Sequence, residues 1–182
     1  MAPSSDASFF EAIPWCARLL ADPNMAVTSW SSREAKDDGE DTCFSETLKT
    51  ARTIDKSIAF YRKRASENSR VEESYMLLSL GSGLDGHAGL LHGGIISTIV
   101  DEGTGFLLQA NVGGREEMTT LYTVALNVSY TKPVRTPSVV LVSAEWLEWK
   151  GRKANIRATI RDATGSVLAV GDALFVQARE RL

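Results

Sequence analysis

The later part of the chain alternates apolar and polar residues with the period of a β-strand. Val124, Leu126, Val128 and Tyr130, for example, share one face of a strand, and the residues between them share the other. Short connections that contain glycine separate the last three of these segments, as in β-hairpins. The pattern predicts strands over residues 74–80, 121–130, 139–149, 154–161 and 167–176, with the last four joined as an antiparallel meander.

Residues 95–110 lack this alternation, because nearly every position is apolar or small and only Asp101 and Glu102 are charged. A helix that is apolar nearly all round is expected to be buried. One long central helix covered by a curved antiparallel sheet satisfies the whole pattern. We therefore predict an α+β domain of this kind over residues 71–182.

The first part of the chain has a different character. Apolar residues recur at helical spacing over residues 10–20, although Pro14 should interrupt that helix, and again over residues 44–61. Between them, residues 31–42 are polar, acidic and without a period, which indicates a loop. Residues 1–70 are therefore predicted to form a helical and irregular extension.

Composition excludes several classes of protein. A net charge of −3 on 182 residues argues against a general nucleic-acid binder. Two cysteines cannot build a disulfide framework. No run approaches the roughly 18 apolar residues of a membrane span, so stable membrane insertion is not expected. The N-terminus lacks the pattern of a secretory signal, so we expect a cytoplasmic protein, with a mitochondrial location left open.

Residues 81–86 spell GxGxxG after a predicted strand. In a dinucleotide-binding domain a helix begins at once, and a parallel strand follows. Here a second glycine-rich turn follows instead, and the remaining strands form a meander. We therefore interpret these glycines as a tight turn.

Candidate chemistry gathers where the predicted central helix begins. Gly93 and Gly94 follow His92 at a point where backbone N–H groups have no partner within the helix. Such a helix start favours a developing oxyanion, both by hydrogen bonding and through the helix dipole. Asp101 is a carboxylate on the same helix, and it is either hydrogen-bonded structurally or positioned as a base or nucleophile.

The spacing of these groups has a geometric consequence. Asp101 lies seven residues after Gly94, or about 10 Å along a helix axis. A catalytic carboxylate must come within about 3 Å of the atom on which it acts. Two antiparallel copies of the helix could each lend Asp101 to the other's glycine turn. We therefore predict a homodimer, or a dimer of dimers, with active sites at the subunit interface.

Three motifs occur in order: HGG-x6-D over residues 92–101, T-x3-N-x-S-Y-x2-P over residues 123–133, and GRK over residues 151–153. Together they resemble the hot-dog-fold acyl-CoA thioesterases of the 4-hydroxybenzoyl-CoA thioesterase superfamily. The phenylacetate-degradation and mammalian thioesterase-superfamily-member types are the most similar. The resemblance covers about residues 72–178 and implies a hot-dog fold that hydrolyses acyl-CoA to a carboxylic acid and free CoA.

The resemblance also implies roles for individual residues. Gly93, with His92 and Gly94 around it, would form the oxyanion hole, and Asp101 would act as general base or as nucleophile. Thr123 matches a position that orients water. Two segments of this chain match family segments that line the coenzyme A groove: Ser129, Tyr130 and Thr131, and Lys150, Gly151, Arg152 and Lys153. No metal or other cofactor is implied, since coenzyme A enters as part of the substrate.

One position departs from the family, and two other functions compete. Some relatives carry a water-positioning Asn where this chain has Gly86, next to His87, so that role is not carried over to position 86. A hot-dog hydratase or dehydratase would need a histidine base and a helix acid, for which His87 and Glu102 are the available pair. A non-catalytic acyl-CoA binding module would need neither.

Overall fold

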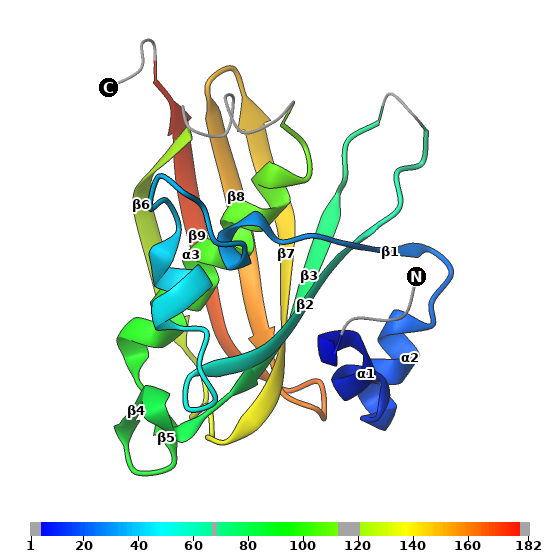
Figure 1. Ribbon diagram of the computed structural model, residues 1–182. Coiled ribbons are helices and arrows are strands. Elements are labelled where there is room, and N and C mark those ends of the chain that lie inside the picture. Colours follow the sequence, from blue (N-terminus) through cyan, green and yellow to red (C-terminus); the bar gives the residue numbers. More distant parts are fainter. Residues whose placement is uncertain (1–4, 67–68, 113–120, 179–182) are drawn as a thin grey trace.

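A computed structural model describes residues 5–66, 69–112 and 121–178 (Figure 1). Its main feature is a seven-stranded antiparallel sheet in the order β1-β2-β3-β7-β8-β9-β6. The strands are β1 Met25–Thr28, β2 Ile54–Arg62, β3 Glu73–Leu80, β6 Leu121–Tyr130, β7 Ser138–Lys150, β8 Lys153–Arg161 and β9 Val167–Gln177. A small hairpin of β4, Asp85–His87, and β5, Leu90–Leu91, precedes the long helix α3, Gly93–Gln109.

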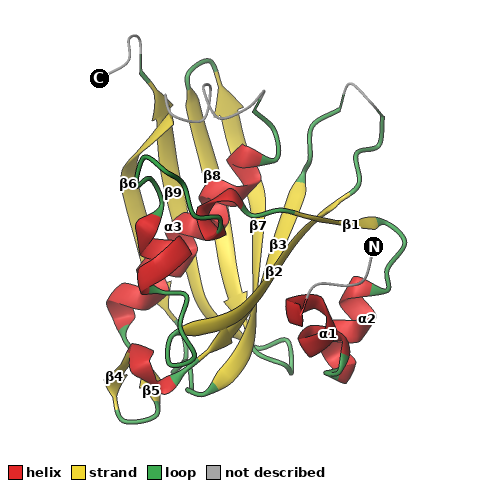
Figure 2. Ribbon diagram, in the orientation of Figure 1, coloured by secondary structure: helices red, strands yellow, loops and turns green. Residues whose placement is uncertain are grey.

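Helix α3 crosses one face of the sheet, as Figures 1 and 2 show. Its apolar side chains, among them the fully buried Ile99 and Leu107, pack into the main core with the sheet. Close approach depends on Gly171 of β9, where a Cβ would lie 2.5 Å from Cγ1 of Val100. The predicted α+β arrangement of a central helix against a curved antiparallel sheet is confirmed.

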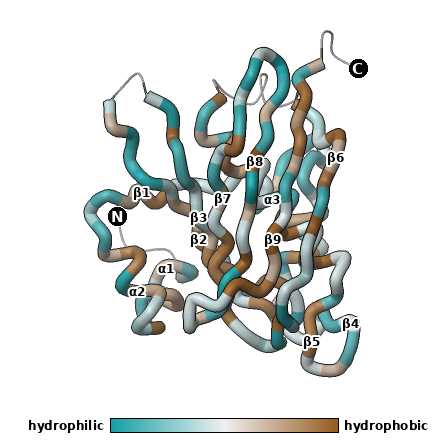
Figure 3. Tube along the Cα trace, turned by 180° about the vertical axis from the view of Figure 1, so that it is seen from behind, coloured by the Kyte–Doolittle hydropathy of each residue, from teal (hydrophilic) through white to brown (hydrophobic). Residues whose placement is uncertain are grey.

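Two short helices, α1 Ser5–Glu11 and α2 Pro14–Leu20, cover part of the opposite face. Successive residues of a strand point to opposite faces of a sheet, so β2 and β3 serve both layers. Phe60 and Leu77 pack with Phe10 of α1 and Cys16 of α2, whereas their strand neighbours join the α3 core. Figure 3 shows the resulting mixture of hydrophobic and hydrophilic residues along the strands. The predicted interruption near Pro14 is confirmed: α1 ends at Glu11, and Pro14 is the first residue of α2.

The predicted helix over residues 44–61 is wrong beyond one helical turn, Cys43–Thr47: residues 48–53 form turns, and the chain forms β2 from residue 54 onward. Burial explains the error: Ile58, Ala59 and Phe60 are consecutive and all buried, because β2 has a packed layer on each face. Such a strand has no clean period of two, and chance apolar residues at helical spacing dominate the pattern. The division at residue 70 stays a prediction, but β2 of the predicted extension pairs with β3 of the main sheet.

The predicted meander holds for β7, β8 and β9, which pair in order. The expectation that β6 precedes β7 in it is wrong, because β6 pairs with β9 and forms an edge of the sheet. This crossover places β6 beside α3, where the two elements build the candidate site.

Candidate active site

His92 caps the start of α3. The N–H of Gly94 donates a hydrogen bond of 2.9 Å to Nδ1 of His92, which requires that nitrogen to carry no proton. The N–H groups of Ile95 and Ile96 donate to the His92 carbonyl, at 3.0 and 3.1 Å. The N–H of Gly93 donates to no atom of the residues that the structure describes. Of the two glycine amides expected to be exposed, Gly94 is therefore occupied and Gly93 is available.

Tyr130 of β6 contacts the first turn of α3. Its hydroxyl lies 3.2 Å from the Gly93 carbonyl, to which it donates, and 2.8 Å from Oγ of Ser97. The predicted groove residue Tyr130 thus contacts the predicted oxyanion-hole residue directly. Its neighbours Ser129 and Thr131 are exposed.

Asp101 and Thr123 also meet. The Thr123 hydroxyl donates a hydrogen bond of 3.0 Å to Oδ1 of Asp101. Burial raises the pKa of the half-buried Asp101 carboxyl above its usual range, against the smaller opposing effect of this hydrogen bond. A carboxylate with a raised pKa and a fixed hydroxyl partner is suited to accept a proton from water.

A β-bulge makes this contact possible. Thr123 pairs with Phe175 and Ala125 with Leu174, so Val124 is an extra residue in β6. Strict alternation would place Thr123 on the face opposite Leu126, away from the helix. The bulge moves Thr123 to the helix face and leaves Val124 56% exposed.

Asp101 faces a pocket of about 680 Å³ rather than a sealed interior. Helix α3 and strands β6 and β9 form one side of it, and the segment of residues 31–41 forms the other. Its described lining residues are Ser31, Ser32, Glu34, Lys36, Glu40, Asp41, Asp101, Glu102, Gly105, Gln109, Val112, Leu121, Tyr122, Thr123 and Phe175. The part that residues 31–41 play in lining the pocket was not predicted, because a polar stretch without a period does not indicate what its side chains contact.

Within one chain, both Asp101 and the predicted coenzyme A-binding hairpin lie far from Gly93 at the start of α3. Gly93 and Asp101 are eight residues apart on α3, or about 12 Å along its axis. The hairpin of Lys150, Gly151, Arg152 and Lys153 lies at the opposite end of the sheet from the start of α3 (Figure 1). There Arg152 donates to the Gln177 carbonyl at 2.7 Å, and Gly151 turns the chain with a φ of 58°.

The acid–base pair required for a hydratase is not assembled within the chain. Glu102 accepts a hydrogen bond of 2.6 Å from Nε1 of Trp30, and burial raises its pKa against the effects of Ser32 and Trp30. His87 is exposed on β4, which precedes the start of α3, whereas Glu102 lies in the second half of the helix. At Gly86, where some relatives carry Asn, a Cβ would lie 2.9 Å from Cδ2 of His92, so this backbone leaves no room for a side chain.

The described part of the chain contains no group of three or more His, Cys, Asp or Glu side chains that could hold a metal ion. In the same residues, no helix combines the length and the apolar character needed to cross a membrane.

Comparison with known proteins agrees with this geometry. Residues 88–169, which contain the start of α3, Asp101 and Thr123, match the thioesterase superfamily. The chain is thus similar to the thioesterase superfamily over this region. It is 29% identical over 163 residues to verlamelin biosynthesis protein B of Lecanicillium, covering 73% of this chain and 71% of that protein.

Two further relatives come from animals. Mouse acyl-coenzyme A thioesterase THEM4 is 31% identical over 112 residues, which are 60% of this chain but only 45% of the mouse protein. The structure of zebrafish thioesterase superfamily member 2 superposes with a TM-score of 0.59 at 15% identity, over 81% of this chain and 91% of that one. At that identity the superposition shows the fold alone, and it confirms the predicted hot-dog fold.

Proposed function

We propose that this protein belongs to the thioesterase superfamily and hydrolyses acyl-CoA thioesters to a carboxylic acid and free CoA. The observation that carries the proposal is the hydrogen bond from Thr123 to Asp101 at the pocket, on the helix that begins with the available Gly93 amide. The match of residues 88–169 to the thioesterase superfamily and the similarity to THEM4, an acyl-CoA thioesterase, support the same reaction.

The mechanism assigns one task to each group. The Gly93 N–H, aided by the helix dipole, holds the thioester oxygen as the carbonyl becomes tetrahedral. Asp101 either removes a proton from the attacking water or attacks the carbonyl itself and forms an anhydride that water then opens. In both routes the C–S bond breaks, and the CoA sulfur leaves as a thiolate that takes up a proton. Thr123 orients the Asp101 carboxylate through its hydrogen bond.

The active site is completed by a second copy of the chain. The axial distance of about 12 Å between Gly93 and Asp101 exceeds what one substrate carbonyl can span. The edge strand β6 offers a surface for pairing, with Tyr122, Val124 and Tyr130 exposed by 38, 56 and 56%. An antiparallel pair of α3 helices would bring Asp101 of each chain toward the glycine turn of the other.

Coenzyme A recognition follows from the same arrangement. Antiparallel pairing brings the far end of one sheet near the start of the other chain's α3. The exposed cations Lys150, Arg152 and Lys153 then approach the end at which the thioester is held, where they can bind the phosphates of CoA.

The reaction is tested with a panel of acyl-CoAs and a thiol-detecting reagent. The Asp101→Asn variant should lose at least about 100-fold in turnover, on the scale of acid–base groups. Asp55→Asn, at an exposed position of β2, serves as the matched control and should keep full activity. An Asp101→Asn variant as fast as wild type would refute the assignment of Asp101 as the catalytic carboxylate. Hydration of an enoyl-CoA without release of thiol would favour the hydratase.

Shared sites are tested by mixing two inactive variants. Chains with Asp101→Asn and chains with Gly93→Pro should recover about one quarter of wild-type activity when exchanged at equal amounts, because half the dimers are mixed and each mixed dimer has one intact site. Sites contained in single chains would recover nothing. The non-catalytic binding module predicts acyl-CoA binding without turnover in every sample.

A further inference from the structure

The segment that follows β1 is fastened to the catalytic helix. Trp30 is buried, and its indole N–H donates a 2.6 Å hydrogen bond to Oε1 of Glu102. Oγ of Ser31 donates to Oε1 of Gln109, two turns further along α3, at 3.2 Å. These contacts hold the segment against the helix face that carries Asp101, where it becomes a wall of the pocket.

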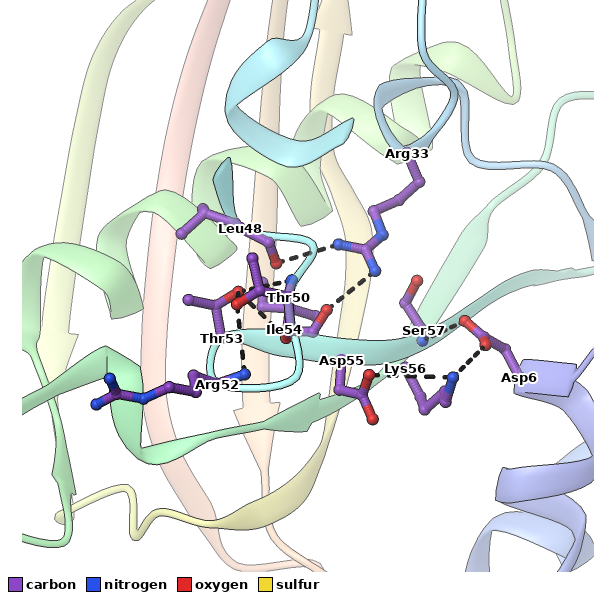
Figure 4. Close-up of polar contacts among 10 residues, drawn as sticks. All are labelled: Asp6, Arg33, Leu48, Thr50, Arg52, Thr53, Ile54, Asp55, Lys56 and Ser57. Atoms are coloured by element: carbon purple, nitrogen blue, oxygen red, sulfur yellow. Dashed lines mark hydrogen bonds and ion pairs between the residues drawn. The ribbon is translucent and has the colours of Figure 1, made fainter. Parts of the chain in front are cut away.

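Arg33 fastens the same segment from its other side (Figure 4). Its guanidinium is buried and donates to the carbonyl oxygens of Phe44, Leu48 and Ile54, at 3.1, 3.2 and 3.0 Å. The Arg33 carbonyl in turn accepts a hydrogen bond of 2.7 Å from Nζ of Lys49. A buried cation that donates to three carbonyl oxygens holds the chain around Arg33 in one position. The segment that lines the pocket is therefore anchored to the rest of the fold.

Acidic side chains predominate in the pocket lining. Its described residues include five carboxyl groups and one ammonium group: Glu34, Glu40, Asp41, Asp101, Glu102 and Lys36. The first three belong to the wall, whereas Asp101 and Glu102 belong to α3, where burial raises their pKa values. The ammonium group of Lys36 forms ion pairs with Glu40, at 3.2 Å, and with Asp41. One positive charge offsets only part of the charge of these two carboxylates, and Glu34 adds a further negative charge to the wall. The apolar part of the lining comes from residues such as Leu121, Tyr122 and Phe175.

We propose that residues 30–41, held to α3 by the Trp30–Glu102 hydrogen bond, form a specificity wall that restricts the pocket at Asp101 to uncharged acyl groups. The proposal rests on the proposed function for the identity of the ligand. An acyl chain that ends in a carboxylate would meet like charges in a partly desolvated pocket, which costs affinity. A neutral chain of the same length meets the apolar lining without that repulsion.

Binding of two thioether analogues tests the wall without relying on turnover. S-hexyl-CoA and S-(5-carboxypentyl)-CoA differ in one terminal carboxylate and are not hydrolysed. Calorimetry on the wild-type protein should show tighter binding of S-hexyl-CoA by at least about tenfold, and the ratio should shrink at high salt. Equal affinities, or no binding of either analogue, would overturn the proposal.

Variants separate the wall from general electrostatics. Glu34→Lys places a cation in the pocket lining and should reduce the ratio at least about threefold. Glu46→Lys makes the same charge change at an exposed position outside the lining and should leave the ratio unchanged. If both variants act alike, the wall has no specific role.

The fastening is tested with Trp30→Phe, which keeps an aromatic ring but removes the donor to Glu102. Hydrogen exchange of the amides of residues 31–36 should become faster, and the preference for S-hexyl-CoA should shrink. Trp149→Phe, on the partly exposed Trp149 of β7, is the matched control. Unchanged exchange and preference in Trp30→Phe would refute the fastening.

Hydrolysis separates failure of the wall from failure of the proposed function. Wild type should hydrolyse hexanoyl-CoA faster than adipoyl-CoA, each with six acyl carbons. If the analogues bind as expected and neither ester is cleaved, the proposed function fails and the wall stands. If both esters are cleaved at equal rates, the wall fails and the proposed function stands.

Discussion

The Gly93→Pro substitution removes the proposed oxyanion-hole donor at a position where the backbone accepts proline. Gly93 is the first residue of α3, a position at which helices accept proline because its missing N–H has no partner within the helix. The preceding residue, His92, has φ −63° and ψ 135°, the extended conformation that a following proline requires. A Cβ at position 93 would lie 3.6 Å from the Tyr130 ring, an ordinary contact.

The expected loss follows from the hydrogen bonds around the turn. Loss of one oxyanion-hole donor typically costs about 10²–10³-fold in kcat, or about 2.7–4 kcal/mol. No neighbouring described amide can substitute, since those of Gly94, Ile95 and Ile96 all donate to His92. The helix dipole persists and retains about 0.3–1 kcal/mol of the stabilisation. We therefore expect a loss of about 100-fold in kcat, near the lower end of the range.

The assay compares Gly93→Pro with Gly93→Ala, which adds a side chain but keeps the N–H. Turnover of an acyl-CoA accepted by wild type should remain within about threefold in the alanine variant and fall in the proline variant. Thermal unfolding of both variants guards against a folding defect, because proline at a compatible position does not destabilise. Equal turnover of the two variants, with both folded, would refute the assignment of Gly93.

Three further predictions concern Asp101 and the helix cap. Thr123→Val removes the hydroxyl that lowers the pKa of Asp101, so the acidic limb of the kcat/KM profile should move to higher pH, whereas Thr123→Ser should leave it in place. Because burial raises the pKa of Asp101, its ionised form destabilises the fold. The free energy of unfolding therefore decreases as pH rises through the pKa of Asp101 in the folded state. Asp101→Asn should have a higher Tm than wild type at neutral pH but not at about pH 3, where Asp101 is protonated. His92→Ala should lower the free energy of unfolding in urea by about 1 kcal/mol, and His92→Asn by less; equal losses would contradict the cap on Gly94.

Patterns within single elements were enough to predict the framework of the fold. The uninterrupted apolar character of residues 95–110 predicted the buried helix α3, and glycine-containing connections predicted the hairpins of β7, β8 and β9. The pairing of β6 with β9 was not predictable in this way, because it depends on a connection between residues distant in sequence. The strand β2 was missed because both of its faces are buried.

The candidate site was predictable as a set of residues but not as a geometry. The motifs identified Asp101 and Thr123, yet strict alternation in β6 would have turned Thr123 away from the helix. A single extra residue, Val124, corrects this, and no feature of the sequence marks the bulge. The position of Thr123 therefore follows from how β6 and β9 pair, and not from the order of polar and apolar residues within β6.

The pocket wall shows the same limit from the opposite direction. Residues 31–42 were expected to be a loop because they lack a period, and a pocket lining has none, since its side chains face a cavity instead of a packed layer. The contact that positions the wall joins Trp30 to Glu102, 72 residues apart. A pair so distant leaves no local pattern, and each partner alone has a simpler explanation, as a core tryptophan or an isolated helix acid. The contact between Trp30 and Glu102 beside Asp101 is what places the N-terminal segment in the lining of the pocket.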